Sequence, residues 1–153
     1  QYAPEALRAD REVVVTAIRQ DARAFAFASA DLRADRDIVR MAVCQDGDLI
    51  SFAAGSLLGD ADLMLAAARQ DCEVLQFASK ALRSSRDFVL AAVRCDGLAL
   101  RFASPELRAD REVALEAVRT SPGALRHVVP ELRDDCDIVS AVGRARKRRR
   151  LAS

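Results

Sequence analysis

The chain repeats itself every 25 residues, and this period constrains its fold more than any other feature. Leucines recur at Leu7, Leu32, Leu57, Leu82, Leu107 and Leu132, and aromatic residues at Tyr2, Phe27, Phe52, Phe77 and Phe102. Alanines recur at Ala17, Ala42, Ala67, Ala92 and Ala117. A fixed short period is typical of one small supersecondary unit stacked in a row.

Each repeat predicts one helix of about ten residues, such as 11–20. The residue before it can accept hydrogen bonds from the N–H groups of the first turn and is predicted as the N-cap: Asp10, Asp35, Asp60, Ser85, Asp110 and Asp135. An acid two positions later suits the positive end of the helix dipole. Apolar residues at offsets of one, four and five, as in Val13, Val14, Ala17 and Ile18, form one buried stripe.

A second, shorter helix is expected at about 22–29, with Ala24, Phe25, Phe27 and Ala28 as its apolar set, and a short third turn follows in some repeats. The recurring alanine predicts a close approach of neighbouring helices. The predicted repeat core consists of Ala17, Phe27, Leu32, Ala42, Phe52, Leu57, Ala67, Phe77, Leu82, Ala92, Phe102 and Leu107.

These patterns predict an all-α fold of tandem 25-residue helical hairpins, stacked as a short α-solenoid. A compact helical bundle is the alternative, because six units are few. One unit buries too little apolar surface to offset its loss of conformational entropy, so contacts between units must stabilise the stack.

The predicted array covers residues 1–143, with units that begin near residues 7, 32, 57, 82, 107 and 132. Residues 1–6 match the end of a preceding unit. The chain is therefore expected to be a piece of a longer protein, and an open end containing Tyr2 and Leu7 suggests self-association.

Residues 144–153 are predicted to form a basic C-terminal tail. Six of the seven residues from 144 to 150 are basic: Arg144, Arg146, Lys147, Arg148, Arg149 and Arg150. Without these six of its 24 basic residues, the rest of the chain has 18 against 23 acidic ones. Such a cluster is a candidate contact for a partner or for nucleic-acid phosphates.

The repeat resembles a known family in two motifs, Arg108-Ala109-Asp110-Arg111-Glu112-Val113 and Asp96-Gly97-Leu98-Ala99-Leu100-Arg101-Phe102-Ala103-Ser104. They are similar to the tandem-repeat domain of unknown function numbered forty-one-sixteen, which is common in protists and algae. The resemblance extends to about Val142. It implies a helical repeat, and it implies no activity or catalytic residues.

The residues themselves predict no enzyme, no cofactor and no metal site. His127 is the only histidine, stands where other repeats have phenylalanine, and is interpreted as structural. The cysteines, at positions 44, 72, 95 and 136, form no CxxC pair, and reduced thiols are expected over a disulfide. A metal cluster of the first three is a further alternative. The pattern favours a reducing intracellular compartment, without separating the nucleus from an organelle. No apolar run is long enough for a membrane span.

The leading hypothesis is a non-enzymatic protein-interaction module, a scaffold or accessory subunit of a larger assembly. The alternative is a nucleic-acid-associated protein that binds phosphates through its basic tail. Two arginine series are further candidates for binding: Arg8, Arg33, Arg83, Arg108 and Arg133, with Arg11, Arg36, Arg86 and Arg111 nearby. Pairing with neighbouring acids is the expected role of these arginines.

Overall fold

The computed structural model describes residues 4–152, except for the side chains of Arg149 and Ala152, and contains only helices and connecting turns there. The predicted all-α class is therefore confirmed. The chain divides into two compact units, Gln1–Ala78 and Ser79–Ser153, which are described separately. Tyr2 lies outside the described residues. Among the described helices, none combines the length and the apolar character that crossing a membrane would require.

Each repeat contributes one long helix. Unit 1 contains α2 (Arg11–Gln20), α4 (Arg36–Gln45) and α5 (Ala61–Ala68), and unit 2 contains α7 (Arg86–Cys95), α9 (Arg111–Thr120) and α11 (Cys136–Ala152). The range of α2 matches the expected helix at 11–20. The long helices begin one residue after the repeated aspartate or serine, two residues before the apolar stripe starts.

The aspartates hold the first turn of these helices. One carboxylate oxygen accepts hydrogen bonds from two backbone N–H groups, at Asp10, Asp35, Asp60, Asp110 and Asp135. Ser85 occupies the same position before α7, but its side chain accepts no hydrogen bond from the helix. The predicted side-chain cap is therefore wrong at Ser85, although α7 begins at the expected residue.

The second helix of each repeat is a 3₁₀-helix, which corrects the helix expected at 22–29. Unit 1 contains η1 (Ala22–Phe27), η2 (Gly47–Phe52) and η4 (Cys72–Phe77), and unit 2 contains η5 (Gly97–Phe102) and η6 (Pro122–His127). Backbone bonds join residues three apart, as from the N–H of Ala28 to the carbonyl of Phe25 (3.1 Å). The helix therefore turns about every three residues.

A short turn precedes each long helix. These turns are α1 (Glu5–Ala9), α3 (Ala30–Arg33) and η3 (Gly55–Gly59) in unit 1, and α6 (Lys80–Arg83), α8 (Pro105–Arg108) and α10 (Pro130–Arg133) in unit 2. They carry the repeated leucine, which is buried at Leu82 and Leu107, half-buried at Leu32 and Leu57, and exposed at Leu7. Of the four leucines predicted in the core, Leu82 and Leu107 are buried there, whereas Leu32 and Leu57 lie at its edge.

The three-residue turn explains why the predicted aromatic core is wrong. Residues three apart share one side of a 3₁₀-helix, and repeat positions 22, 25 and 28, with position 24 beside them, are each buried in four of the five repeats. At position 25, Phe25, Ile50, Leu75 and Leu100 are 2% exposed or less, and Leu125 is half-buried. Those at position 27 lie off this side: Phe27, Phe52 and Phe77 are 45%, 43% and 38% exposed. Phe102 is half-buried.

The alanines of the long helices lie where the helices meet. Ala42, Ala67, Ala92 and Ala117 are buried, and Ala17 is half-buried. A small side chain at these positions lets the backbones of neighbouring elements approach. The structure thus places four of the five predicted alanines in the core and Ala17 at its edge.

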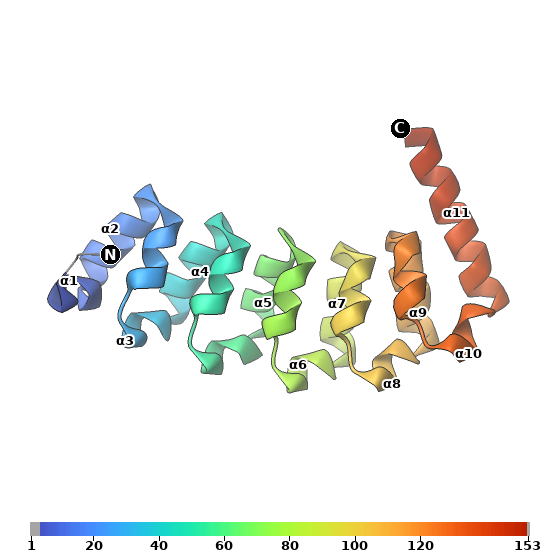
Figure 1. Ribbon diagram of the computed structural model, residues 1–153, viewed down its shortest axis with the longest axis horizontal. Helices are drawn as coiled ribbons and strands as arrows, with labels where there is room; N and C mark the ends of the chain where they lie inside the picture. The colour runs from blue at the N-terminus through green and yellow to red at the C-terminus, as the bar shows by residue number, and fades with distance from the viewer. Residues whose placement is uncertain (1–3, 153) are drawn as a thin grey trace. The chain divides into compact units, whose positions relative to one another are not determined.

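Within each unit the repeats stack in two rows (Figure 1). The long helices pack side by side, α4 against α2 and α5 in unit 1, and α9 against α7 and α11 in unit 2. The 3₁₀-helices form the second row, in which η2 contacts η1 and η4, and η5 contacts η6. Backbone bonds cross between repeats, from the Ser29 N–H to the Arg8 carbonyl and from the Ser104 N–H to the Arg83 carbonyl (both 2.9 Å). Each unit is a stack of repeats rather than a closed bundle.

The basic segment is the second half of a helix rather than a separate tail. α11 runs without a break from Cys136 to Ala152, so the predicted boundary after residue 143 does not coincide with a structural one. Arginine, lysine, leucine and alanine are all good helix formers, and they continue the helix through this segment. Ala145 is buried, which shows that the start of the basic segment packs against the rest of unit 2.

Candidate functional site

The arginines at the start of the long helices connect neighbouring repeats. Arg36 of α4 reaches the beginning of α5, where its Nε donates to Asp60 (2.6 Å) and its Nη2 to Asp62 (3.2 Å). In unit 2, Arg86 pairs in the same way with Asp110 and Glu112, and Arg111 pairs with Asp135 and Asp137. These ion pairs give the second arginine series a structural role, and the neighbouring carboxylates compensate its positive charge.

Asp60→Asn should lower the free energy of unfolding by about 0.5–1 kcal/mol near neutral pH. The hydrogen bond from Arg36 lowers the pKa of Asp60 below its ordinary value of 3.8, against the opposing effect of burial. Because the folded-state pKa is the lower one, the carboxylate stabilises the fold above pH 3.8 and loses this effect as the pH falls through the folded-state pKa. The asparagine oxygen can still cap α5, so the change isolates the charge.

Chemical denaturation of the parent chain and of Asp60→Asn, repeated at decreasing pH, measures this effect. The difference between the two proteins should diminish in acid. A difference that is the same at every pH would show that the charge of Asp60 does not stabilise the fold.

The arginines of the short turns have a different environment. The Nε atoms of Arg33, Arg83 and Arg108 are buried, and no atom in the described part of the chain accepts a hydrogen bond from them. A buried donor without an acceptor costs about 1–3 kcal/mol. Since the same arrangement occurs in both units, it belongs to the repeat rather than to one local defect.

Arg83 borders a groove in unit 2. The groove has a volume of about 330 Å³ and is lined by Lys80, Arg83, Ser84, Phe102, Ala103, Ser104, Pro105 and Glu106. The guanidinium of Arg101 lies over the ring of Phe102, 4.3 Å from its centroid, in a cation–π contact. The groove therefore brings together cations, hydroxyl groups, one carboxylate and an apolar wall.

His127 lies one repeat after Phe102 and occupies the same repeat position. Its Nε2 accepts a hydrogen bond from the Nε of Arg126 (2.9 Å). Burial lowers the pKa of His127, and the positive charges of Arg126, Arg101, Arg108 and Arg133 lower it further. The imidazole is thus a neutral hydrogen-bond acceptor among arginines at neutral pH.

Arg133 shows how an arginine of the short turns can be satisfied. Its Nε donates to the carbonyl of Val128 (2.9 Å) and its Nη2 to the carbonyl of Arg126 (3.0 Å). Both acceptors are oxygens of the same chain. The buried Nε atoms of Arg83 and Arg108 lack an equivalent acceptor in the described part of the chain.

The basic half of α11 presents its charges on two sides. Arg144 and Arg148, four residues apart, line a hollow of about 350 Å³ together with Arg119. Arg146, Lys147 and Arg150 line a second, wider hollow of about 770 Å³ with Pro122 and Gly143. The side chain of Arg149 lies outside the described residues. The predicted basic contact residues therefore form two groups rather than one patch.

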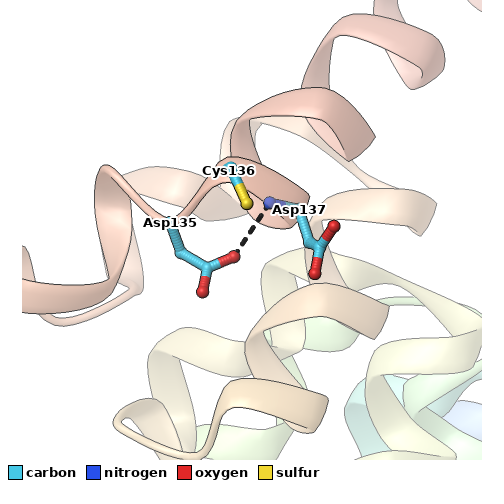
Figure 2. Close-up of side chains that lie close together, drawn as sticks. All are labelled: Asp135, Cys136 and Asp137. Atoms are coloured by element: carbon cyan, nitrogen blue, oxygen red, sulfur yellow. Dashed lines mark hydrogen bonds between the residues drawn. The ribbon is translucent and has the colours of Figure 1, made fainter.

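One group of adjacent metal-ligand types lies at the start of α11: Asp135, Cys136 and Asp137 (Figure 2). Asp135 accepts hydrogen bonds from the backbone N–H groups of Asp137 (2.9 Å) and Ile138 (3.2 Å). Both carboxylates also pair with Arg111. Helix capping and this ion pair account for the arrangement, which gives no reason to assign a metal site.

The exposed aromatic position is the surface feature that sequence reasoning missed. A signal for it was present, because each 3₁₀-helix carries two apolar series two residues apart, exemplified by Phe25 and Phe27. Both series cannot face the core of so narrow a helix. The larger and more regular phenylalanine series is the exposed one in unit 1.

The fold and these surfaces define a class, the α-helical tandem-repeat proteins. A family model described as "Domain of unknown function (DUF4116)" matches the chain in four overlapping segments, residues 1–33, 10–58, 35–83 and 60–108. The chain belongs to this family. Comparisons with curated proteins and with solved structures found no match. The family description names no activity, so the function has to be inferred from the surfaces of the repeat.

Proposed function

We propose that the chain is a non-enzymatic interaction module, a scaffold or accessory subunit, that binds a protein partner through the aromatic position of its repeats. The observation that carries this proposal is the exposure of Phe27, Phe52 and Phe77 in unit 1. Large apolar side chains in contact with water do little for stability. Aromatic residues are enriched among the residues that contribute most to protein interfaces.

The repeat supports the proposal as well. Stacked repeats present equivalent side chains at regular intervals, and extended binding surfaces of repeat proteins arise in this way. In unit 1 the three phenylalanines stand at the ends of η1, η2 and η4, so each repeat offers the same group to a partner. A partner that spans several repeats gains from each ring.

A triple variant, Phe27→Ser, Phe52→Ser and Phe77→Ser, tests the proposal. The tagged full chain should recover a defined set of proteins from native extract after nuclease treatment, and the triple variant should recover at least about tenfold less of them. Val139→Ser is the control, because Val139 is 51% exposed and belongs to the long helix α11 rather than to the aromatic position of a repeat. Equal recovery by the parent chain and the triple variant would refute the proposal, provided that circular dichroism shows the variant folded.

A second candidate function is the binding of nucleic-acid phosphates by α11. Its support is the run of basic residues at 144–150, of which every described side chain except that of the buried Ala145 is exposed. Neutralised phosphates release counterions, so such binding weakens steeply with added salt. In the same capture experiment, loss of all recovered material on nuclease treatment would favour this candidate over the first.

A further inference from the structure

Three arginines of unit 2 converge on one hollow beside two long helices. Arg119 lies in the last turn of α9, and Arg144 and Arg148 lie four residues apart on one side of α11. The two helices pack side by side (Figure 1), so side chains from both line the hollow. All three arginines are exposed, and a ligand can therefore reach their guanidinium groups from solvent.

The hollow has a small apolar floor. Besides the three arginines, its described lining consists of Ala141 and Ala145, which are 1% and 6% exposed. The short alanine side chains leave room between the longer arginines. The resulting volume of about 350 Å³ falls within the range of small-molecule sites, about 300–1,000 Å³.

The positive charge around the hollow has little compensation. No carboxylate is present among the described residues that line it. Arg119 pairs with Glu116 at 3.6 Å, but the same carboxylate also pairs with Arg94 at 3.6 Å. In the described part of the chain, no carboxylate forms an ion pair with Arg144 or Arg148. Converging cations that lack counter-charges attract anions.

We propose that this hollow binds a compact anion with several neighbouring phosphate groups, such as a linear triphosphate. A guanidinium group is always charged, and its planar fork can donate two parallel hydrogen bonds to one phosphate. Three such groups from two helices match the dense negative charge of a triphosphate. The inference goes beyond the proposed function, because the hollow contains no residue of the aromatic position.

The placement of the charges favours a compact anion over a nucleic-acid strand. A strand binds best along a continuous positive groove that follows its backbone. In α11 the basic residues are divided, because Arg146, Lys147 and Arg150 line the second hollow instead. The described lining of the first hollow also contains no aromatic ring on which a base could stack.

Isothermal titration calorimetry of the full chain with inorganic triphosphate, in buffer free of divalent metal ions, tests the proposal. The parent chain should show saturable binding. Arg119→Gln and Arg144→Gln should each weaken it about tenfold, the effect of losing one charge-assisted hydrogen bond. Arg146→Gln is the matched control, because it removes the same charge from the same helix but lines the other hollow. It should leave the affinity close to that of the parent chain.

A parallel titration with adenosine triphosphate identifies the source of the phosphate groups. Because the described lining offers nothing to a base, inorganic triphosphate should bind at least as tightly as the nucleotide. That result assigns the site to free polyphosphate. Tighter binding of the nucleotide, again weakened by Arg119→Gln, would uphold the site and assign it to a nucleotide.

Three results would overturn the inference. The first is absence of triphosphate binding by the parent chain up to millimolar concentration. The second is equal weakening by Arg144→Gln and Arg146→Gln in folded variants, which would indicate general charge attraction. The third is tighter binding of a thymidine oligonucleotide that all three substitutions weaken. The triple phenylalanine variant should still bind triphosphate, so failure of the proposed function and failure of this site can be told apart.

Discussion

Phe25→Ala should lower the free energy of unfolding by about 3–5 kcal/mol, whereas Phe27→Ala should cost about 1 kcal/mol or less. The two phenylalanines lie two residues apart in η1 but differ in burial, since Phe25 is 0% exposed and Phe27 is 45% exposed. Removal of the Phe25 ring leaves a cavity between η1 and the long helices. Removal of the Phe27 ring mainly returns surface to water.

Guanidinium denaturation followed by circular dichroism measures both changes in the full chain. The comparison is well matched, because the same atoms are removed from the same helix. Similar losses in the two variants would contradict the burial pattern and would restore Phe27 to the core. Since a repeat protein can lose one repeat locally, hydrogen exchange of the α2 and η1 amides provides the second readout.

The long helices could be predicted from the sequence because their signals are local. Asp35 accepts hydrogen bonds from the N–H groups of Asp37 and Ile38, which lie only two and three residues away. Such contacts are encoded within one turn and need no knowledge of the neighbouring repeat. Because the pattern occurs in six aligned copies, it remains recognisable where one copy departs from it, as at Ser85.

The type of the second helix could not be predicted in the same way. An α-helix and a 3₁₀-helix over residues 22–27 have similar apolar patterns, but they turn a different residue toward the core. The choice depends on how closely the next long helix approaches, which is a contact between repeats. Which residues of this helix face the core depends on the same contact, so the predicted aromatic core at Phe27, Phe52 and Phe77 was wrong.

The two arginine series show the same limit at the candidate site. Arg33 and Arg36 are three residues apart and chemically identical, yet Arg36 pairs with Asp60 and the Nε of Arg33 is buried without an acceptor among the described atoms. Sequence spacing predicts charge on the surface of a repeat. It does not reveal which of these charges the next repeat compensates.

Gly97→Ala should destabilise unit 2 by about 3 kcal/mol, at the upper end of the range for an overpacked core. A Cβ atom on Gly97 would lie 2.0 Å from the carbonyl oxygen of Ala117 and 2.9 Å from the Cβ of Ser121. Both neighbours are backbone or short side chains that cannot turn aside, so η5 and α9 would have to separate. None of the described glycines has a positive φ. The expected loss of stability therefore comes from the steric clash and not from backbone strain. Ala22 occupies the same repeat position in η1, so the local backbone itself accepts a side chain.

Two other glycines serve as comparisons for the Gly97→Ala variant. Gly47→Ala should be milder, because its Cβ would lie 2.9 Å from the carbonyl oxygen of Ala67. Gly143→Ala should raise the stability by about 0.5–1 kcal/mol, since nothing lies within 4 Å of its Cβ and alanine is the better helix former. Thermal and chemical denaturation of the three variants should rank them in this order, from Gly97 through Gly47 to Gly143. If Gly97→Ala is as stable as the parent chain, α9 does not press against η5 as closely as the structure shows, and the stacking of repeats in unit 2 must be looser.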